Sequence, residues 1–287
     1  MLATKFNPHT QASKRQSQAY VKTITSRQNG LVRRFRAIRQ ERRSARTYLV
    51  LDGLRIIAEA TRAGVQIDTL LVSAYGLRNN PNIRTLVETC DTSGTILASG
   101  TDRVMDAVSP LRTASTAVAL APHIPVSADV IVPQRTGCVL MPIGVQDPGN
   151  LGTIIRTAAA AGVTGIIVDR SSADPFGWKA LRGAMGGTFR LPVIDFRNVS
   201  DILPQARQYG WTVVGTTPRA EASLYEIDLR KPMIILMGNE GSGLDTRIIN
   251  EVDIRMSIPM LNGIESLNVA AAAALITYEI RRQWKQK

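Results

Sequence analysis

The chain has 287 residues, of which 44% are hydrophobic and 20% charged, so it can build one large or two ordinary globular domains. It lacks a run of ~18 apolar residues and an N-terminal signal core, so we expect no membrane partner and a cytoplasmic location. With 2 cysteines and 2 histidines, neither a disulfide framework nor a four-ligand zinc site is expected, and we predict no metal.

Positive charge is concentrated near the N-terminus. Residues 1–46 contain 12 lysines and arginines against a single acid, Glu41, and carry +11 of the formal +12 charge. A segment of nearly pure sign repels itself without a counter-charge, which indicates a polyanionic partner. Nucleic acid is favoured over an anionic membrane.

The first half of the chain predicts a small α/β domain over residues 20–121, after a flexible basic arm at 1–19. From Ser26, a plausible N-cap, Leu31, Phe35 and Ile38 recur at helical spacing. Apolar strand patterns then alternate with helical ones. The expected strands are 48–51, 69–73, 95–98 and 115–120, and the expected helices are 55–63, 83–89 and 101–108.

A proline-containing linker is predicted at 122–136, followed by a second α/β domain at 137–287. Short apolar strands separated by helices predict a mostly parallel sheet covered on both faces. The expected strands are 137–141, 165–168, 190–193, 212–215, 233–237 and 255–258, and the expected helices are 151–161, 179–185, 201–208 and 267–284.

Three loops marked by glycine or proline follow predicted strands, at 147–152, 238–244 and 258–268. Ligands bind at this end of the strands in an open α/β sheet, although each loop alone could be only a tight turn. The second loop, GNEGSGL, has the spacing GxxGxG rather than the GxGxxG of dinucleotide-binding proteins. A nicotinamide-dependent oxidoreductase is therefore a weaker alternative.

Taken together, the three loops resemble the motifs of the SpoU (TrmH) branch of the SPOUT superfamily of RNA methyltransferases. Asn150, Gly152, Arg156 and Ala158 match the first motif, Asn-x-Gly-x-x-x-Arg-x-Ala. Residues 238–244 match Gly-Asn-Glu-Gly-x-Gly-Leu, and 258–260 with 265–269 match Ile-Pro-Met and Glu-Ser-Leu-Asn-Val. The first 120 residues, with LDGLRIIAEA at 51–60, resemble the family's ribosomal-protein-like substrate-binding domain.

The resemblance implies methylation of a ribose 2′-hydroxyl in RNA, with S-adenosylmethionine as the methyl donor. It implies a C-terminal domain with a deep trefoil knot, and a homodimer formed through that domain with the cofactor near the subunit interface. The expected cofactor-binding residues lie at strand ends and in the second and third motifs: Thr216, Gly238, Asn239, Gly241, Ile258, Met260 and Leu267.

Arg156 is the first candidate for catalysis. An arginine has a pKa above ~12 and is a poor base, so its expected role is to position phosphate or ribose and to stabilise a developing alkoxide. Small and apolar neighbours predict a packed environment for it. We expect Glu240 and Asn268 to orient it, and Ser266 and Asn150 to complete the catalytic set.

Arginines supply phosphate affinity with little sequence information. The candidate RNA-binding residues are Arg27, Arg33, Arg34, Arg36 and Arg182. Two residues after Arg182, Ala184 stands where the family commonly has a serine, so no serine role is predicted there. Structured RNA is the expected substrate, with ribosomal RNA preferred on account of the extra domain; transfer RNA and a non-catalytic RNA-binding protein of the same fold remain open.

Overall fold

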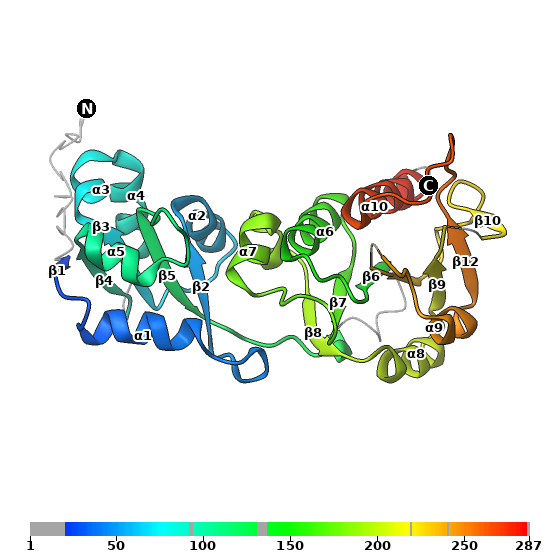
Figure 1. The fold of residues 1–287 in the computed structure, drawn as a ribbon, viewed down its shortest axis with the longest axis horizontal. Helices are drawn as coiled ribbons and strands as arrows, with labels where there is room; N and C mark the ends of the chain where they lie inside the picture. Colours follow the sequence, from blue (N-terminus) through cyan, green and yellow to red (C-terminus); the bar gives the residue numbers. More distant parts are fainter. Residues whose placement is uncertain (1–20, 92–93, 131–136, 219, 240, 286–287) are drawn as a thin grey trace, which may run out of the picture.

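The structure is a computed structural model that describes residues 21–91, 94–130, 137–218, 220–239 and 241–285 (Figure 1). The arm predicted at 1–19, the end of the predicted linker and the candidate Glu240 lie outside the described residues. The described residues form two sheets, one from the chain up to Pro122 and one from the chain after Gly137.

The first sheet has the strand order β1-β4-β3-β5-β2, in which only β5 runs antiparallel to its neighbours. Successive side chains of a strand point to opposite faces, so a strand buried on both sides is apolar throughout. Leu70 and Leu71 of β3 accordingly pack on opposite faces, and both are fully buried. The strands are β1 (Lys22–Ile24), β2 (Tyr48–Asp52), β3 (Thr69–Ser73), β4 (Ile96–Gly100) and β5 (Ala117–Pro122).

Helices cover both faces of this sheet. α2 (Leu54–Arg62) and α4 (Pro81–Cys90) pack on one face, and α1 (Gly30–Arg39) and α5 (Asp102–Val108) on the other. The short α3 (Ala74–Asn79) follows β3. Helix α1 buries Val32 and Phe35, which leaves most of its arginines facing outward.

The second sheet has the order β10-β12-β9-β11-β6-β7-β8, and all its neighbouring strands are parallel. The carboxyl ends of its strands therefore meet at one edge, as the sequence predicts. The strands are β6 (Cys138–Pro142), β7 (Gly165–Asp169), β8 (Val193–Arg197), β9 (Thr212–Thr216), β10 (Ala222–Ser223), β11 (Met233–Met237) and β12 (Ile254–Ser257).

Helices α6 (Pro148–Ala161) and α10 (Val269–Lys285) pack on one face of the second sheet, and α8 (Val199–Gln208) and α9 (Thr246–Glu251) on the other. Helix α6 has clear end signals. The Asp147 side chain accepts hydrogen bonds from the amides of Gly149 and Asn150, and Gly162 ends the helix at a φ of 81°.

The two domains lie side by side, with α7 (Trp178–Ala184) between α2 and α6 (Figure 1). Leu181 of α7 is buried in the apolar core of the first domain, together with the partly buried Phe176 and Phe189. No helix within the described part of the chain is both long and apolar enough to cross a membrane.

Some predicted elements are wrong in position or were missed. The strand predicted at 190–193 is found at Val193–Arg197, because Gly187–Phe189 forms a 3-10 helix and Pro192 lacks the N–H that a ladder needs. The N-cap of α1 is Asn29 rather than Ser26. The short elements β1, α3, β10 and α9 were not predicted, since so few residues show no clear period.

Candidate active site

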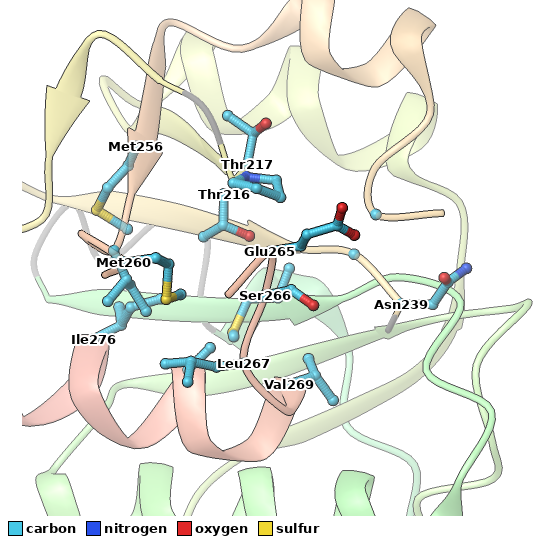
Figure 2. Close-up of a pocket in the computed structure, with 16 residues that line it drawn as sticks. Thr216, Thr217, Asn239, Met256, Met260, Glu265, Ser266, Leu267, Val269 and Ile276 are labelled. Carbon is cyan, nitrogen blue, oxygen red and sulfur yellow. The ribbon is translucent and has the colours of Figure 1, made fainter. Parts of the chain in front are cut away.

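A cavity lies where β9, β11 and β12 end, and the segment 258–268 closes it (Figure 2). Its open volume is about 660 Å³, which includes space open to solvent. Six of the seven predicted cofactor-binding residues line it: Thr216, Gly238, Asn239, Ile258, Met260 and Leu267. Gly241 is not among the lining residues.

The walls of the cavity are mainly apolar, with a few polar groups at one side. Met237, Met256 and Ile276 form part of the wall, and Glu265 and Ser266 supply oxygen atoms (Figure 2). Such a surface fits a nucleoside-sized ligand with an apolar ring and polar attachments. Glu265 was not assigned a role from the sequence, although its place in the third motif was a usable signal.

The glycine loop after β11 is held by its own asparagine. The Asn239 side-chain oxygen accepts hydrogen bonds from the amides of Gly241 (2.9 Å) and Ser242 (2.7 Å). Gly238 must be glycine, because a Cβ there would lie 2.2 Å from the carbonyl carbon of Gly243. The loop therefore folds back on itself and presents backbone groups to the cavity.

Asn268 joins the third motif to the first. Its side-chain oxygen accepts from the amide of Ala270 at 2.9 Å, at the start of α10, and its amide nitrogen donates to the Asn150 side-chain oxygen at 3.1 Å. Asn150 lies in the first turn of α6. The two predicted catalytic asparagines, 118 residues apart in sequence, are thus in direct contact.

Arg156 lies on α6, six residues after Asn150. The expectation of a packed environment is wrong: its side chain is exposed, while Ile154 and Ile155 are buried. Asn268 bonds Asn150 rather than Arg156, so the predicted orientation of Arg156 by Asn268 is not observed. The exposed side chain of Arg156 is accessible to a substrate phosphate or ribose.

Two glycines bring α6 against α7. A Cβ on Gly152 would lie 2.5 Å from the carbonyl oxygen of Ala180 and 2.9 Å from the Cα of Gly183. This close approach explains why the first motif requires glycine four residues before Arg156. It also places the exposed Arg182 of α7 on the helix that adjoins α6.

The predicted RNA-binding arginines divide into two groups. Arg33 and Arg36 are exposed on α1, and Arg27 is exposed while its Nε donates to the carbonyl of Arg103 at 3.0 Å. Arg34 instead donates to Asp68 at 2.8 Å and stacks on the Tyr48 ring. Arg34 is therefore engaged in contacts within the first domain, and its RNA-binding role stays a prediction.

Nucleophiles and metal ligands are scarce around the site. Burial raises the pKa of the Cys90 thiol to about 11, and it also raises the pKa of Cys138, which is fully buried. Among the described residues, no group of three or more histidine, cysteine or acidic side chains could hold a metal ion. The groups that the described site offers are backbone, amide, hydroxyl and carboxylate groups, with Arg156 on α6.

Comparison with known proteins decides the family. Residues 137–278 match the SpoU rRNA Methylase family. A relative from Synechocystis, described as an uncharacterized tRNA/rRNA methyltransferase, is 32% identical over 92% of this chain and 94% of its own length. The chain belongs to the SpoU rRNA methylase family.

A second relative and a solved structure also match. The 23S rRNA (guanosine(2553)-2′-O)-methyltransferase RlmP of Bacillus subtilis is 40% identical over 50% of this chain and 57% of its own length. The crystal structure of an AdoMet-bound rRNA methyltransferase from Sinorhizobium meliloti has a TM-score of 0.78 at 30% identity, covering 91% of this chain and 98% of that one.

This SpoU protein is accordingly an RNA 2′-O-methyltransferase with S-adenosylmethionine as its methyl donor. The predicted family and cofactor are confirmed, and the nicotinamide-dependent alternative is excluded. The α/β class with a mostly parallel second sheet is confirmed as well.

Proposed function

We propose that the chain methylates a ribose 2′-hydroxyl of structured ribosomal RNA. The observation that carries the proposal is the convergence of all three motifs, with the Asn150–Asn268 contact joining α6 to the loop that closes the cavity. The ribosomal choice is supported by the relatives from Bacillus subtilis and Sinorhizobium meliloti, which are described as acting on rRNA. Transfer RNA is the second candidate, because the Synechocystis relative is described as a tRNA/rRNA enzyme.

The cavity residues suit S-adenosylmethionine. The apolar wall of Met237, Met256 and Ile276 would take the adenine ring, while backbone groups near Gly238 and Leu267 would take the polar parts. When bound, the cofactor supplies an activated methyl group with its own leaving group. The protein has only to hold the acceptor oxygen in line and to help it lose one proton.

The roles of the remaining residues follow from their positions. Arg156, exposed on α6, would bind a substrate phosphate and stabilise negative charge on the 2′-oxygen as its proton leaves to solvent. Asn150 and Asn268 would keep α6 and the 258–268 segment in register. Ser266 and the undescribed Glu240 remain predicted members of the catalytic set.

A homodimer through the C-terminal domain is part of the proposal. Helix α10 presents an apolar stripe to solvent at Ala271, Ala274, Leu275 and Tyr278, and Tyr225 adjoins it. Leu275 is 41% exposed and Tyr278 52% exposed. A contiguous apolar surface of this kind indicates an interface, and a second copy of the same helix would cover it.

Two further predictions stay proposals. A deep trefoil knot is proposed from the family motifs; α10, which follows the 258–268 segment, packs on α6. A cytoplasmic location is supported by Cys90 and Cys138, which are free thiols in buried positions and so suit a reducing compartment.

The test is methyl transfer from labelled S-adenosylmethionine to total ribosomal and total transfer RNA, followed by mapping of alkali-resistant ribose positions. One resistant site in ribosomal RNA is the expected result. A methylated site in transfer RNA would make transfer RNA the substrate instead. No transfer to either pool, with cofactor binding also absent, would favour a non-catalytic RNA-binding protein.

A further inference from the structure

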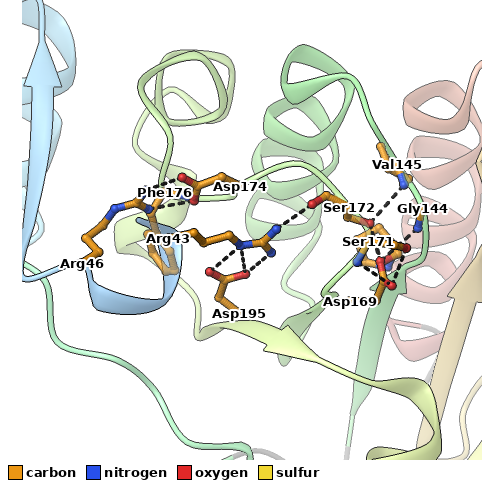
Figure 3. A network of polar contacts seen from close by, with 11 residues as sticks. Arg43, Arg46, Gly144, Val145, Asp169, Ser171, Ser172, Asp174, Phe176 and Asp195 are labelled. Carbon is orange, nitrogen blue, oxygen red and sulfur yellow. Dashed lines mark hydrogen bonds and ion pairs between the residues drawn. The ribbon is translucent and has the colours of Figure 1, made fainter. Parts of the chain in front are cut away.

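Two partly buried ion pairs join the N-terminal domain to the catalytic domain (Figure 3). Their arginines, Arg43 and Arg46, lie between α1 and β2, within and just after a 3-10 helix at Arg43–Ala45. Arg43 Nε donates to both carboxylate oxygens of Asp195 at 2.9 Å, and Arg46 Nη1 donates to Asp174 at 2.7 Å. The two arginine side chains are 17% and 13% exposed.

Burial and pairing remove both guanidinium groups from the surface that could meet RNA. Removing one partner of such a pair leaves the other charge uncompensated inside the protein, whereas an exposed arginine is solvated by water and needs no partner. These two residues belong to the basic segment at 1–46, for which the sequence predicts a polyanionic partner. Their counter-charges are carboxylates of the catalytic domain.

From Arg43 the contacts continue toward the first motif (Figure 3). Its Nη1 donates to the carbonyl oxygen of Ser172 at 2.6 Å. The Ser172 hydroxyl donates to Asp169 at 2.7 Å and accepts from the amide of Val145 at 3.0 Å. Asp169 also accepts from the amide of Gly144 at 3.0 Å.

The segment 143–147 held in this way leads directly into α6. The Val145 carbonyl accepts from the amide of Ala173 at 2.8 Å, and Asp147 caps the helix that carries Asn150 and Arg156. A Cβ on Gly144 would lie 3.2 Å from the Asn239 side-chain nitrogen, so the same segment touches the second motif. Displacement of 143–147 would move the start of α6 and the glycine loop together.

We propose that Arg43 and Arg46 are positioning residues for methyl transfer: docking of the N-terminal domain through Asp195 and Asp174 fixes the 143–147 segment and thereby sets Asn150 and Arg156. The inference rests on the proposed function. It differs from an RNA-binding role, which would act on substrate affinity, and from simple domain attachment, which would leave the rate at saturating RNA unchanged.

The decisive variants are Arg43→Ala and Asp195→Asn. Each is expected to lower kcat by about tenfold or more while KM for RNA changes less than about threefold, because misplaced groups slow the chemical step. Asp195 is negatively charged and is not expected to bind RNA phosphate. Equal losses of kcat in Arg43→Ala and Asp195→Asn would therefore show that the ion pair, rather than an RNA contact of Arg43, is what matters. The double variant should lose no more than either single one.

Three controls separate the loss of the ion pair from loss of charge and loss of folding. Arg42→Ala removes the same charge from an exposed neighbour, and its kcat should stay within about twofold of wild type. Arg43→Lys keeps a positive charge beside Asp195, so it folds, but it loses the planar fork and should show a lower kcat at unchanged KM. Cofactor binding and thermal melting are measured on every variant.

Hydrogen exchange gives a readout independent of methylation. The amides of Gly144 and Val145 are expected to exchange about tenfold faster or more in Arg43→Ala than in wild type. Wild-type kcat or wild-type exchange in that variant, or a change confined to KM, would overturn the inference. Absence of methyl transfer in the wild-type protein would instead count against the proposed function, and the exchange experiment would still decide the inference.

Discussion

Arg156 and Asn150 illustrate two ways in which a side chain contributes to one site. Asn150 is half-buried and bonded to Asn268, so it fixes the relation between α6 and the 258–268 segment. Arg156 is exposed on the same helix. The first residue acts on the protein's own geometry, and the second is available to the substrate.

Replacing Arg156 by alanine is expected to leave cofactor binding and folding unchanged and to lower the rate of methyl transfer by about a hundredfold or more. An exposed side chain contributes little to stability, whereas loss of a charge that stabilises the transition state acts on kcat. Single-turnover transfer and calorimetric binding of S-adenosylmethionine measure the two effects separately. Arg247→Ala, an exposed arginine on α9, is the charge-matched control, and turnover retained in Arg156→Ala would remove Arg156 from the catalytic set.

At the scale of elements, the close contact of α6 with α7 decides where the first motif lies. The two helices meet through Gly152 and Gly183. A Cβ on Gly152 would strike backbone atoms, and a Cβ on Gly183 would lie 3.3 Å from the Cα of Gly152. Helix α7 in turn buries Leu181 in the core of the first domain. One glycine contact therefore connects the catalytic helix to the domain interface.

Gly152→Ala is expected to destabilise the protein by about 2 kcal/mol, because its Cβ would lie 2.5 Å from the carbonyl oxygen of Ala180, a backbone atom. Urea unfolding measures the change. Gly30→Ala is the matched control, since a Cβ there meets nothing within 4 Å and the change should be neutral or slightly stabilising. Equal stabilities of the two variants would show that α6 and α7 can separate without cost.

The outward stripe of α10 also belongs to this scale. Tyr278→Glu places a charge in the proposed dimer interface, and the expected result is a monomer in light scattering where the wild type is a dimer. Tyr75→Glu is the control, because Tyr75 is equally an exposed tyrosine, 68% accessible, but lies in the N-terminal domain. A wild-type monomer, or a dimer that survives Tyr278→Glu, would place the interface elsewhere or remove it.

For the whole molecule, the arginines near the N-terminus fall into two groups. Arg33 and Arg36 are exposed, whereas Arg43 and Arg46 pair with carboxylates of the other domain. Under the proposed function, one basic segment would contribute both to RNA affinity and to assembly of the two domains. Salt would weaken RNA binding more than domain docking, because exposed charges are screened and buried pairs much less so.

The Arg46–Asp174 pair makes stability depend on pH. Burial alone would raise the pKa of Asp174, but the hydrogen bond and charge of Arg46 outweigh it and hold the pKa below its usual value. A carboxyl with a lowered folded-state pKa contributes stability above its unfolded pKa of about 3.9, and that contribution disappears as the pH falls through the lower folded value.

Asp174→Asn is therefore expected to be less stable than wild type by about 2 kcal/mol near neutral pH, and the difference should shrink below about pH 4. Unfolding free energies measured from about pH 7 to about pH 3 give the comparison. Asp228→Asn is a control for an exposed ion pair and should change stability little. A difference that stays constant down to the lowest pH would show that Asp174 does not act through its charge.

The sequence by itself determined the local structure and the family. Apolar runs predicted most strands of both sheets, the pattern at 151–161 predicted α6 except for its first three residues, and the three motifs identified the methyltransferase and six of the cavity residues. These features depend on neighbours a few residues apart, such as backbone conformation, capping and the period of side chains. Such short-range physics can be read directly from the order of residues.

Only the tertiary structure decided which distant groups meet. Asn150 contacts Asn268, and three arginines of the basic segment pair with Asp68, Asp174 and Asp195, all far away in sequence. The exposure of Arg156 likewise depends on how the helices pack. Charge and composition show that a counter-charge is needed but not where it lies, because Coulomb attraction and burial depend on distances that only the packed fold sets.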